Sequence, residues 1–364
     1  MRLSDLDTPA LVVDLDVMEG NLTKMAEYCR RHNLRLRPHT KTHKIPELAR
    51  KQIESGASGI TVAKLGEAEV MIDDGLNDLL IAYPIVGPTK TARLARLAER
   101  ATITVSLDSA EAARGISAAV SDRGANVGIL VEIDVGFGRV GVGSETEALK
   151  LAQTVSSLPG LNFQGLMFFP GHFGVEPDQR AVLRAQVNEL LDRCVETFAR
   201  TGMPIAIVSG GSTPSRYESD RFHGVNEVRP GTYIFNDRNT VGVSAAALDE
   251  CALSVLVTVV STSVSGHAVV DGGSKTFSSD RYQADDERGF GLVKEDPAAE
   301  IERFSEEHGH INVSRSDRRY NVGERLMIIP NHVCSTVNLH DEIYGVRGGQ
   351  VETVWQVAAR GKVR

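Results

Sequence analysis

The chain has 364 residues, 41% hydrophobic and 24% charged, so it has room for a barrel of roughly 250 residues and a second, smaller domain. Its net charge of -8, without a block of lysine and arginine, argues against nucleic acid or an anionic membrane as a partner. No apolar run approaches the ~18–20 residues of a membrane span, and the N-terminus lacks the apolar core of a signal peptide. The four cysteines lie far apart and form no CxxC pair, which is typical of reduced thiols, so we expect a cytoplasmic protein.

Short apolar runs alternate with segments of helical period from residue 34 to residue 235. In the first of these segments Ile45, Leu48, Ala49 and Ile53 recur at helical spacing, and Gly56 follows as a stop signal. Such alternation predicts βαβ units with a parallel sheet. Eight units favour a closed (β/α)₈ TIM-type barrel, with an open doubly wound sheet as the alternative. The eight predicted strands cover residues 34–40, 59–64, 78–84, 102–108, 127–136, 163–171, 205–211 and 227–233.

After about residue 240 the sequence is rich in β-type runs separated by turn residues, which predicts an antiparallel β domain. The run at residues 10–16 is one strand too many for the barrel, and we expect it to pair with that domain. The polar stretch 278–291 is expected to be a surface excursion. The predicted domains are therefore a barrel over residues 17–240 and a β domain made of residues 1–16 and 241–364.

Cations are concentrated where the first predicted strand ends, in the sequence RPHTKTHK. Catalytic groups of such barrels lie at the carboxyl ends of strands. A lysine among other cations has its ammonium form disfavoured, which suits a neutral amine nucleophile of the kind that Schiff-base chemistry needs. The alternative is a solvated basic loop that opens a helix. The cations are Arg37, His39, Lys41, His43 and Lys44.

The seventh predicted strand ends in SGGSTPS, at residues 209–215. Glycines followed by Ser and Thr at a strand-to-helix turn expose backbone N–H groups and hydroxyls, which suit a phosphate. The eighth strand brings Gly231 and Tyr233 next to this turn, and TIM-type barrels often bind phosphate with loops 7 and 8. A plain tight turn is the alternative.

Three glycines at positions 136, 138 and 141 follow the fifth predicted strand with dinucleotide-fingerprint spacing. We reject that interpretation, because the strand lies in the middle of the series and no helix opens cleanly on the third glycine. The glycines are better explained if they let Arg139 approach a flat anionic ligand. A surface arginine at a turn is the alternative.

Two further segments carry groups suited to a metal or to proton transfer. His332 and Cys334 are two residues apart, and on a strand both would face the same side and bind one ion together. A core or surface pair is the alternative, and His308 and His340 are candidate neighbours. His172 ends the sixth predicted strand and is either an acid–base group or a packing histidine.

These segments together resemble the D-threonine aldolase / D-serine dehydratase family of fold-type III pyridoxal phosphate (PLP) enzymes. The resemblance implies an alanine racemase-like barrel, a C-terminal β domain and a homodimer that acts on a small D-amino acid. It extends over nearly the whole chain, through DTPALVVDLD, RPHTKTHK, ASGITVAKLGEAE, VEIDVGFGRVGVG, SGGSTPS, EVRPGTYIFND, VVDGGSK, EEHGHI and PNHVCSTVNLHD.

The resemblance also implies roles for individual residues. Lys41 matches the lysine that forms the Schiff base with PLP, and Arg139 matches the arginine beside the cofactor ring. His332 and Cys334 match the pair that binds a divalent metal, which is Zn²⁺, Mn²⁺ or Mg²⁺. The residues that match the phosphate contacts are Ser209, Gly210, Gly211, Ser212, Gly231 and Tyr233.

The family divides by reaction, and this sequence carries marks of both groups. Its His-Val-Cys matches the His-x-Cys of the dehydratases, whereas the surrounding sequence is closer to the aldolases, which carry His-x-Asp. FFPGHF replaces the Tyr-His-Gly-Ser run of the aldolases, so the tyrosine is missing and His172 is the candidate base.

We therefore expect a PLP- and metal-dependent lyase that cleaves D-3-hydroxy amino acids to glycine and an aldehyde. The first alternative is a D-serine or D-3-hydroxyaspartate dehydratase, which yields a 2-oxo acid and ammonia. An amino-acid racemase, a PLP carrier without turnover and a phosphate-binding barrel enzyme without PLP are further alternatives.

Overall fold

The protein was studied as a computed structural model, which describes residues 1–284 and 289–364. The chain divides into two compact units. The barrel unit comprises residues 25–41, 46–231 and 361–364, and the β unit comprises residues 1–24, 42–45 and 232–360. The domain limits expected from the sequence, at residues 17 and 240, stay a prediction.

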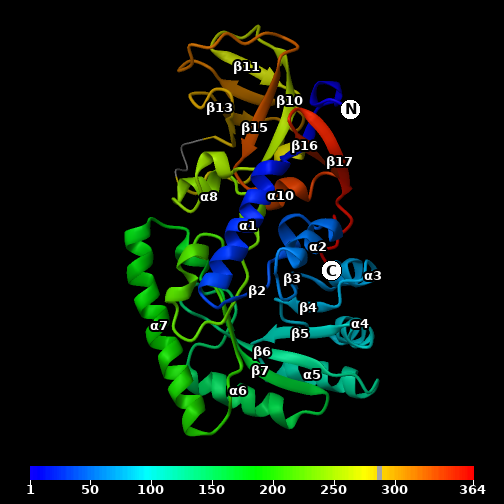
Figure 1. Ribbon diagram of the computed structural model, residues 1–364, viewed down its shortest axis with the longest axis vertical. Helices are drawn as coiled ribbons and strands as arrows, with labels where there is room; N and C mark the ends of the chain where they lie inside the picture. The colour runs from blue at the N-terminus through cyan, green and yellow to red at the C-terminus, as the bar shows by residue number, and fades with distance from the viewer. Residues whose placement is uncertain (285–288) are drawn as a thin grey trace. The chain divides into compact units, whose positions relative to one another are not determined.

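The barrel unit is built on one sheet of eight strands, and every neighbouring pair in it is parallel (Figure 1). Seven of the eight predicted runs contain one of these strands, and the run 163–171 overlaps a strand that begins two residues earlier, at Leu161. Their order across the sheet is β2-β9-β8-β7-β6-β5-β4-β3. The strands are β2 (Arg35–Leu36), β3 (Ile60–Val62), β4 (Asp78–Ile81), β5 (Thr102–Leu107), β6 (Val127–Ile133), β7 (Leu161–Phe168), β8 (Ile207–Gly210) and β9 (Glu227–Val228).

Backbone hydrogen bonds between the two ends of this sheet close it into a barrel. The N–H of Ser58 donates to the carbonyl of Leu36 and that of Thr61 to the carbonyl of Pro38, each at 2.8 Å. His39 also forms a parallel bridge with Thr61. The closed (β/α)₈ barrel is thus confirmed over the open doubly wound sheet.

Helices cover the barrel because both faces of its strands are apolar. Along β4, Leu79 and Ile81 join the large outer core against the helices, whereas Leu80 packs with Leu130 and Met167 in a separate inner cluster. Figure 1 shows α3, α4 and α5 stacked in order beside the strands. The helices after the strands are α2 (Pro46–Glu54), α3 (Leu65–Asp73), α4 (Pro88–Ala98), α5 (Ala110–Ser121), α6 (Glu145–Ser157) and α7 (Pro177–Arg200), and α1 (Leu15–Arg31) precedes β2.

The β unit contains one nine-stranded sheet. Six of its strands, in the order β11-β14-β13-β12-β15-β10, close on themselves through the β10–β11 pairing and are antiparallel throughout. They are β10 (Leu253–Ser261), β11 (His267–Val270), β12 (Gly291–Val293), β13 (Glu300–Phe304), β14 (Gly309–Asn312) and β15 (Arg325–Pro330).

Three more strands extend the sheet beyond β10, namely β1 (Ala10–Asp14), β16 (Glu342–Arg347) and β17 (Gln350–Gln356). The pairing of β1 with β10 confirms that the N-terminal run belongs with the C-terminal strands. The β1–β16 pair is parallel, which the sequence did not indicate. The helices of this unit are α8 (Arg238–Gly242), α9 (Ser274–Phe277) and α10 (Val333–Val337).

The polar stretch 278–291 lies partly outside the described residues, at 285–288. In its described part Gln283 is exposed, as expected of a surface excursion, and Tyr282 lies 4.3 Å below the guanidinium of Arg238. In the described ranges no helix is both long enough and apolar enough to cross a membrane.

Candidate active site

Lys41 lies at the carboxyl end of the first barrel strand, in the short 3-10 helix η2 (Thr40–Thr42), and it is exposed. Two contacts fix this turn. The backbone N–H of Lys41 donates to Nδ1 of His39 at 3.4 Å, and the Thr40 hydroxyl donates to the carbonyl of Thr61 at 3.1 Å. The turn is therefore held to β3 at the place where the barrel closes, and the mouth of the barrel presents the lysine amine.

His39 is the half-buried neighbour of this lysine. Burial, followed by the charges of Lys41, Arg229 and Arg139, holds the pKa of His39 well below its usual value. The imidazole is thus neutral near pH 7, and three cations surround it. Cations of the barrel unit gather at the predicted place, although Arg229 was not among those that the sequence singled out.

The remaining cations of RPHTKTHK do not form a solvated basic loop. Arg37 turns into the barrel, where its Nε donates to Glu227 at 3.0 Å and its Nη1 to Asp78 at 2.7 Å. His43 is fully buried, and Lys44 in the β unit donates to the side-chain oxygen of Asn338 at 2.8 Å. The solvated-loop alternative is wrong, because Arg37, His43 and Lys44 are themselves buried.

A buried polar network fills the barrel below its mouth. Ser209 donates to Glu227 at 2.7 Å, and Arg229 donates to the Ser209 hydroxyl at 2.6 Å and to the carbonyl of Phe168 at 2.8 Å. Burial lowers the pKa of Arg229 to about 10, while Glu227 and Glu132 oppose that change. The sequence signal for this network was present, since charged residues at inward positions of apolar strands need buried partners.

Four of the six predicted phosphate contacts lie at the end of β8 and in the loop that follows it. Gly211 has φ +87°, and an added Cβ would lie 2.9 Å from the hydroxyl of Ser219. At Gly210 a Cβ would lie 2.2 Å from the ring of Phe168, so glycine is required there. The N–H of Gly231 donates to the Thr213 hydroxyl at 3.3 Å, which joins the loops after β8 and β9.

The other predicted phosphate residues differ in their environment. The Ser212 N–H donates to the Ser215 hydroxyl at 3.1 Å, whereas the Ser209 hydroxyl belongs to the buried network. Tyr233 lies in the β unit, in the 3-10 helix η5 (Thr232–Ile234), and is buried. The predicted strand-to-helix turn leads only to a six-residue 3-10 helix, η4 (Arg216–Arg221), because the Thr213 carbonyl and the Ser215 hydroxyl tighten the chain there.

The glycine-rich loop after β6 folds around the carboxylate of Asp134. One oxygen of Asp134 accepts the N–H groups of Gly136, Phe137 and Gly138 at 2.9–3.0 Å. These three N–H groups already donate to Asp134, and α6 begins only at Glu145. Both observations agree with the rejection of a dinucleotide site.

Aromatic side chains and Arg139 gather where β6 and β7 end. The Arg139 guanidinium lies 4.3 Å from the centre of the Phe169 ring, and one of its nitrogens lies 3.8 Å from the Glu132 carboxylate. The His172 ring stacks on Phe137 with centroids 6.4 Å apart. In the described ranges its Nδ1 is buried without a hydrogen-bond partner. Burial lowers the pKa of His172, and Asp134 opposes this, so the ring is suited to accept a proton at neutral pH.

His332 and Cys334 lie at the start of α10 and not on a strand, so the strand placement predicted from the sequence is wrong. β15 ends at Pro330, which has no N–H to extend the ladder. The buried carboxylate of Asp237 then accepts the N–H of Val333 at 3.1 Å and satisfies the first turn of the helix.

Partners of the two side chains fit a metal-ligand pair. Nδ1 of His332 contacts the Asp280 carboxylate at 2.7 Å, and the Cys334 sulfur lies 3.3 Å from the Thr42 hydroxyl. Burial opposes a charge on His332, but Cys334 and Asp280 raise its pKa overall. A carboxylate on one ring nitrogen is the usual support for a histidine that binds metal through the other.

The described residues contain no group of three or more His, Cys, Asp or Glu side chains arranged to hold a metal ion. His308 and His340 therefore do not complete such a group with this pair. Nε2 of His340 instead contacts the carbonyl of Thr276 at 2.9 Å.

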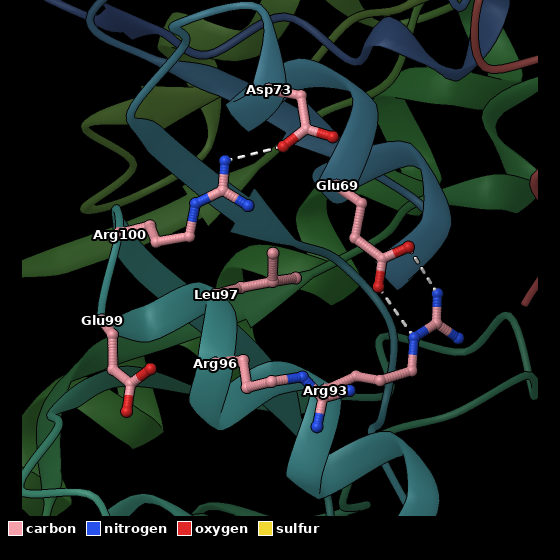
Figure 2. A pocket seen from close by; sticks show the side chains of 7 residues that line it. All are labelled: Glu69, Asp73, Arg93, Arg96, Leu97, Glu99 and Arg100. Carbon is pink, nitrogen blue, oxygen red and sulfur yellow. Dashed lines mark hydrogen bonds and ion pairs between the residues drawn. The ribbon is translucent and has the colours of Figure 1, made fainter.

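A cavity of about 420 Å³ lies on the outside of the barrel unit, between α3 and α4. Figure 2 shows that Arg93 and Arg100 each pair with a carboxylate of α3. Arg93 binds Glu69 at 2.8 Å, and Arg100 binds Asp73 at 2.6 Å. These satisfied surface pairs leave no reactive group, so the candidate site remains the mouth of the barrel.

Comparison with known families matches two domain models to consecutive parts of the chain. Residues 13–239 match the alanine racemase N-terminal domain. Residues 252–346 match a domain described as a putative serine dehydratase domain.

The similar proteins include aldolases and a dehydratase. The D-threonine aldolase of an Arthrobacter species is 35% identical, over 99% of this chain and 94% of that protein. A D-threonine aldolase structure from Filomicrobium marinum covers 100% of this chain and 98% of its own, with 36% identity and a TM-score of 0.94. The D-threo-3-hydroxyaspartate dehydratase structure from Delftia sp. HT23 covers 98% of both chains, with 31% identity and a TM-score of 0.90. Another structure of that dehydratase is of a cysteine-to-alanine mutant in the metal-free form. The chain therefore belongs to the family of PLP-dependent lyases with an alanine racemase-like barrel that includes these aldolases and this dehydratase.

Proposed function

We propose that this protein is an aldolase that cleaves D-threonine and related D-3-hydroxy amino acids to glycine and an aldehyde. The observation that carries the proposal is the half-buried His172, whose pKa is lowered and whose Nδ1 has no partner among the described residues, at the barrel end that also holds Lys41 and Arg139. An aldol cleavage needs a base for the substrate hydroxyl, and a neutral imidazole is suited to that role. Similarity to D-threonine aldolases over the whole chain supports the same reaction.

Residues of the barrel mouth fit the parts of PLP. The amine of Lys41 is the group that would bind its aldehyde carbon, and the loop around Gly211 would hold its phosphate. Arg139, which already lies against an aromatic face, would lie beside its ring. When bound, PLP supplies an electron sink for the bond that breaks at Cα.

His332 and Cys334 would hold a divalent metal, and Asp280 would orient the histidine. The thiolate favours Zn²⁺ over Mn²⁺ and Mg²⁺. The chemistry that such a metal would supply is that of a Lewis acid.

Dehydration is the second candidate function, and the His332–Cys334 pair is the observation that favours it. The two reactions differ in the proton that is removed. In aldol cleavage His172 accepts the proton of the β-hydroxyl, so that the Cα–Cβ bond breaks and the aldehyde leaves. In dehydration Lys41 accepts the proton from Cα and hydroxide leaves Cβ, which gives a 2-oxo acid and ammonia after hydrolysis.

Product analysis separates the two functions. Purified protein is incubated with PLP and D-threonine, with Zn²⁺ and Mn²⁺ in parallel. Glycine with acetaldehyde supports the aldolase, whereas 2-oxobutyrate with ammonia supports the dehydratase and contradicts our proposal. Lys41→Ala is the control that must abolish either product, and borohydride reduction followed by peptide mapping tests whether PLP is attached to Lys41.

The homodimer and the cytoplasmic location expected from the sequence are also proposals. Light scattering on the purified protein tests the first, with a mass of about twice the 39.4 kDa of one chain as the expected result. Cell fractionation tests the second.

A further inference from the structure

Two buried arginines donate hydrogen bonds to backbone carbonyls of the loop that follows β8. Arg216 is 2% exposed, and its Nη1 donates to the carbonyl of Thr213 at 3.0 Å. Arg180 is 3% exposed and reaches over from α7, where its Nη1 donates to the carbonyl of Pro214 at 2.7 Å. The next carbonyl, that of Ser215, accepts the Ser219 hydroxyl at 3.1 Å.

The N–H groups of the same loop differ from its carbonyls in their hydrogen bonding. In the described part of the chain, those of Gly211, Thr213 and Ser215 donate to no protein acceptor, although all three residues are buried. Buried N–H groups without a partner are rare, because each loses its hydrogen bond to water. Three of them in five residues indicate a ligand that accepts hydrogen bonds.

Peptide geometry connects the two observations. The C=O and N–H of a trans peptide point in opposite directions. When Arg180 fixes the Pro214 carbonyl, it also fixes the Ser215 N–H to point away from the arginine. The peptide that carries the Thr213 carbonyl ends at Pro214, which has no N–H, so Arg216 orients no donor directly there and instead holds the backbone that leads into the Pro214–Ser215 peptide.

The charges around this loop do not cancel. Glu218 contacts both Arg180 and Arg184, whereas Arg216 makes no ion pair in the described ranges, and its buried Nε has no partner. A cation that is buried beside a loop of unpartnered N–H groups favours an anion at that loop.

We propose that Arg216 and Arg180 are positioning residues that hold the loop after β8 ready for the phosphate of PLP. This inference rests on the proposed function, because it takes the phosphate end of that cofactor as the anion. Neither arginine was among the phosphate contacts predicted from the sequence. Their role is to bind the carbonyls of the loop, whereas the N–H groups of the loop would contact the phosphate.

A comparison of PLP with pyridoxal, which lacks the phosphate, tests the inference. The full-length protein is freed of cofactor and titrated with each compound, and binding is followed by absorbance. Arg216→Gln and Arg180→Met are each expected to weaken PLP binding by about tenfold or more, since a charged hydrogen bond and its fixed loop are lost. Pyridoxal binding is expected to change by less than about twofold.

Arg184→Gln is the matched control. Arg184 lies one helical turn from Arg180 and contacts the same Glu218, but within residues 1–284 and 289–364 it donates to no carbonyl of this loop. It is expected to leave the affinities for PLP and pyridoxal unchanged. If Arg180→Met does not fold, Arg216→Gln carries the test alone.

Equal weakening of PLP and pyridoxal would mean a general structural role and would overturn the inference. Unchanged PLP affinity in both variants would also overturn it, while leaving the proposed function intact. If the unaltered protein binds neither compound, the cofactor assignment itself fails, and the inference fails with it.

Discussion

The Nδ1 atom of His39 accepts the backbone N–H of Lys41 at a distance of 3.4 Å. A nitrogen that accepts a hydrogen bond carries no proton, so this contact requires a neutral imidazole. Burial and the charges of Lys41, Arg229 and Arg139 act in the same direction. The turn that carries the candidate catalytic lysine therefore depends on the protonation state of a neighbouring histidine.

The first prediction concerns stability against pH. The pKa of His39 is lowered on folding, so below the unfolded value of about 6.5 the unfolded chain binds a proton that the folded chain does not. Stability then falls as the pH decreases, by up to ~1.4 kcal/mol per pH unit. His39→Asn is expected to reduce this slope in urea unfolding measured between pH 7 and pH 5.

His223→Asn is the control for the loss of a histidine. His223 is exposed and contacts Asp192 at 3.0 Å, and its removal is expected to leave the slope at low pH in place. An unchanged slope in His39→Asn would show that His39 is protonated in the folded protein, contrary to our interpretation.

The second prediction concerns His172. His172→Asn is expected to lower kcat for D-threonine cleavage by about 10²–10⁴-fold, the usual contribution of a general base. Because the pKa of His172 is lowered, the acidic limb of the pH profile for kcat/KM is expected below the ordinary value of ~6.5. Steady-state kinetics between pH 5 and pH 9 measure both. If the variant retains full activity, another group accepts the proton.

Local signals in the sequence predicted most of this fold. Each barrel strand is a short apolar run that ends in turn residues, so the pattern gave all eight strands and the place of Lys41. The helix at His332 was missed because its first N–H is satisfied by Asp237, a carboxylate remote in sequence. The charge of Arg229 beside an apolar strand signalled the need for a buried partner, but it did not identify Ser209 and Phe168, which come from other strands. Contacts of this kind depend on the finished fold and leave no pattern of spacing.

The third prediction concerns the support of His332. Asp280→Asn is expected to weaken zinc binding by about 10–100-fold, because the amide replaces the carboxylate that orients the ring. Competition with a chromophoric chelator measures this affinity. Ser335→Ala is the control, since Ser335 also donates to Asp280 at 2.5 Å but is not itself a candidate ligand. Comparable losses in both variants would contradict a specific role for the carboxylate.

The fourth prediction concerns a bulge in β7. Gly165 has φ +150°, and a Cβ there would lie 1.9 Å from the carbonyl oxygen of Ile207 on β8. The register of β6 against β7 shifts beside Gly165, so the strand cannot move without breaking its pairing. Gly165→Ala is therefore expected to destabilise the protein by about 3 kcal/mol or more in urea unfolding.

Gly20→Ala is the control, because Gly20 lies within α1 with no atom within 4 Å of an added Cβ. This change is expected to stabilise the protein by about 0.5–1 kcal/mol. Tolerance of alanine at position 165 would mean that β7 can slide past β8, and the barrel would then be less rigid below its mouth than the buried network implies.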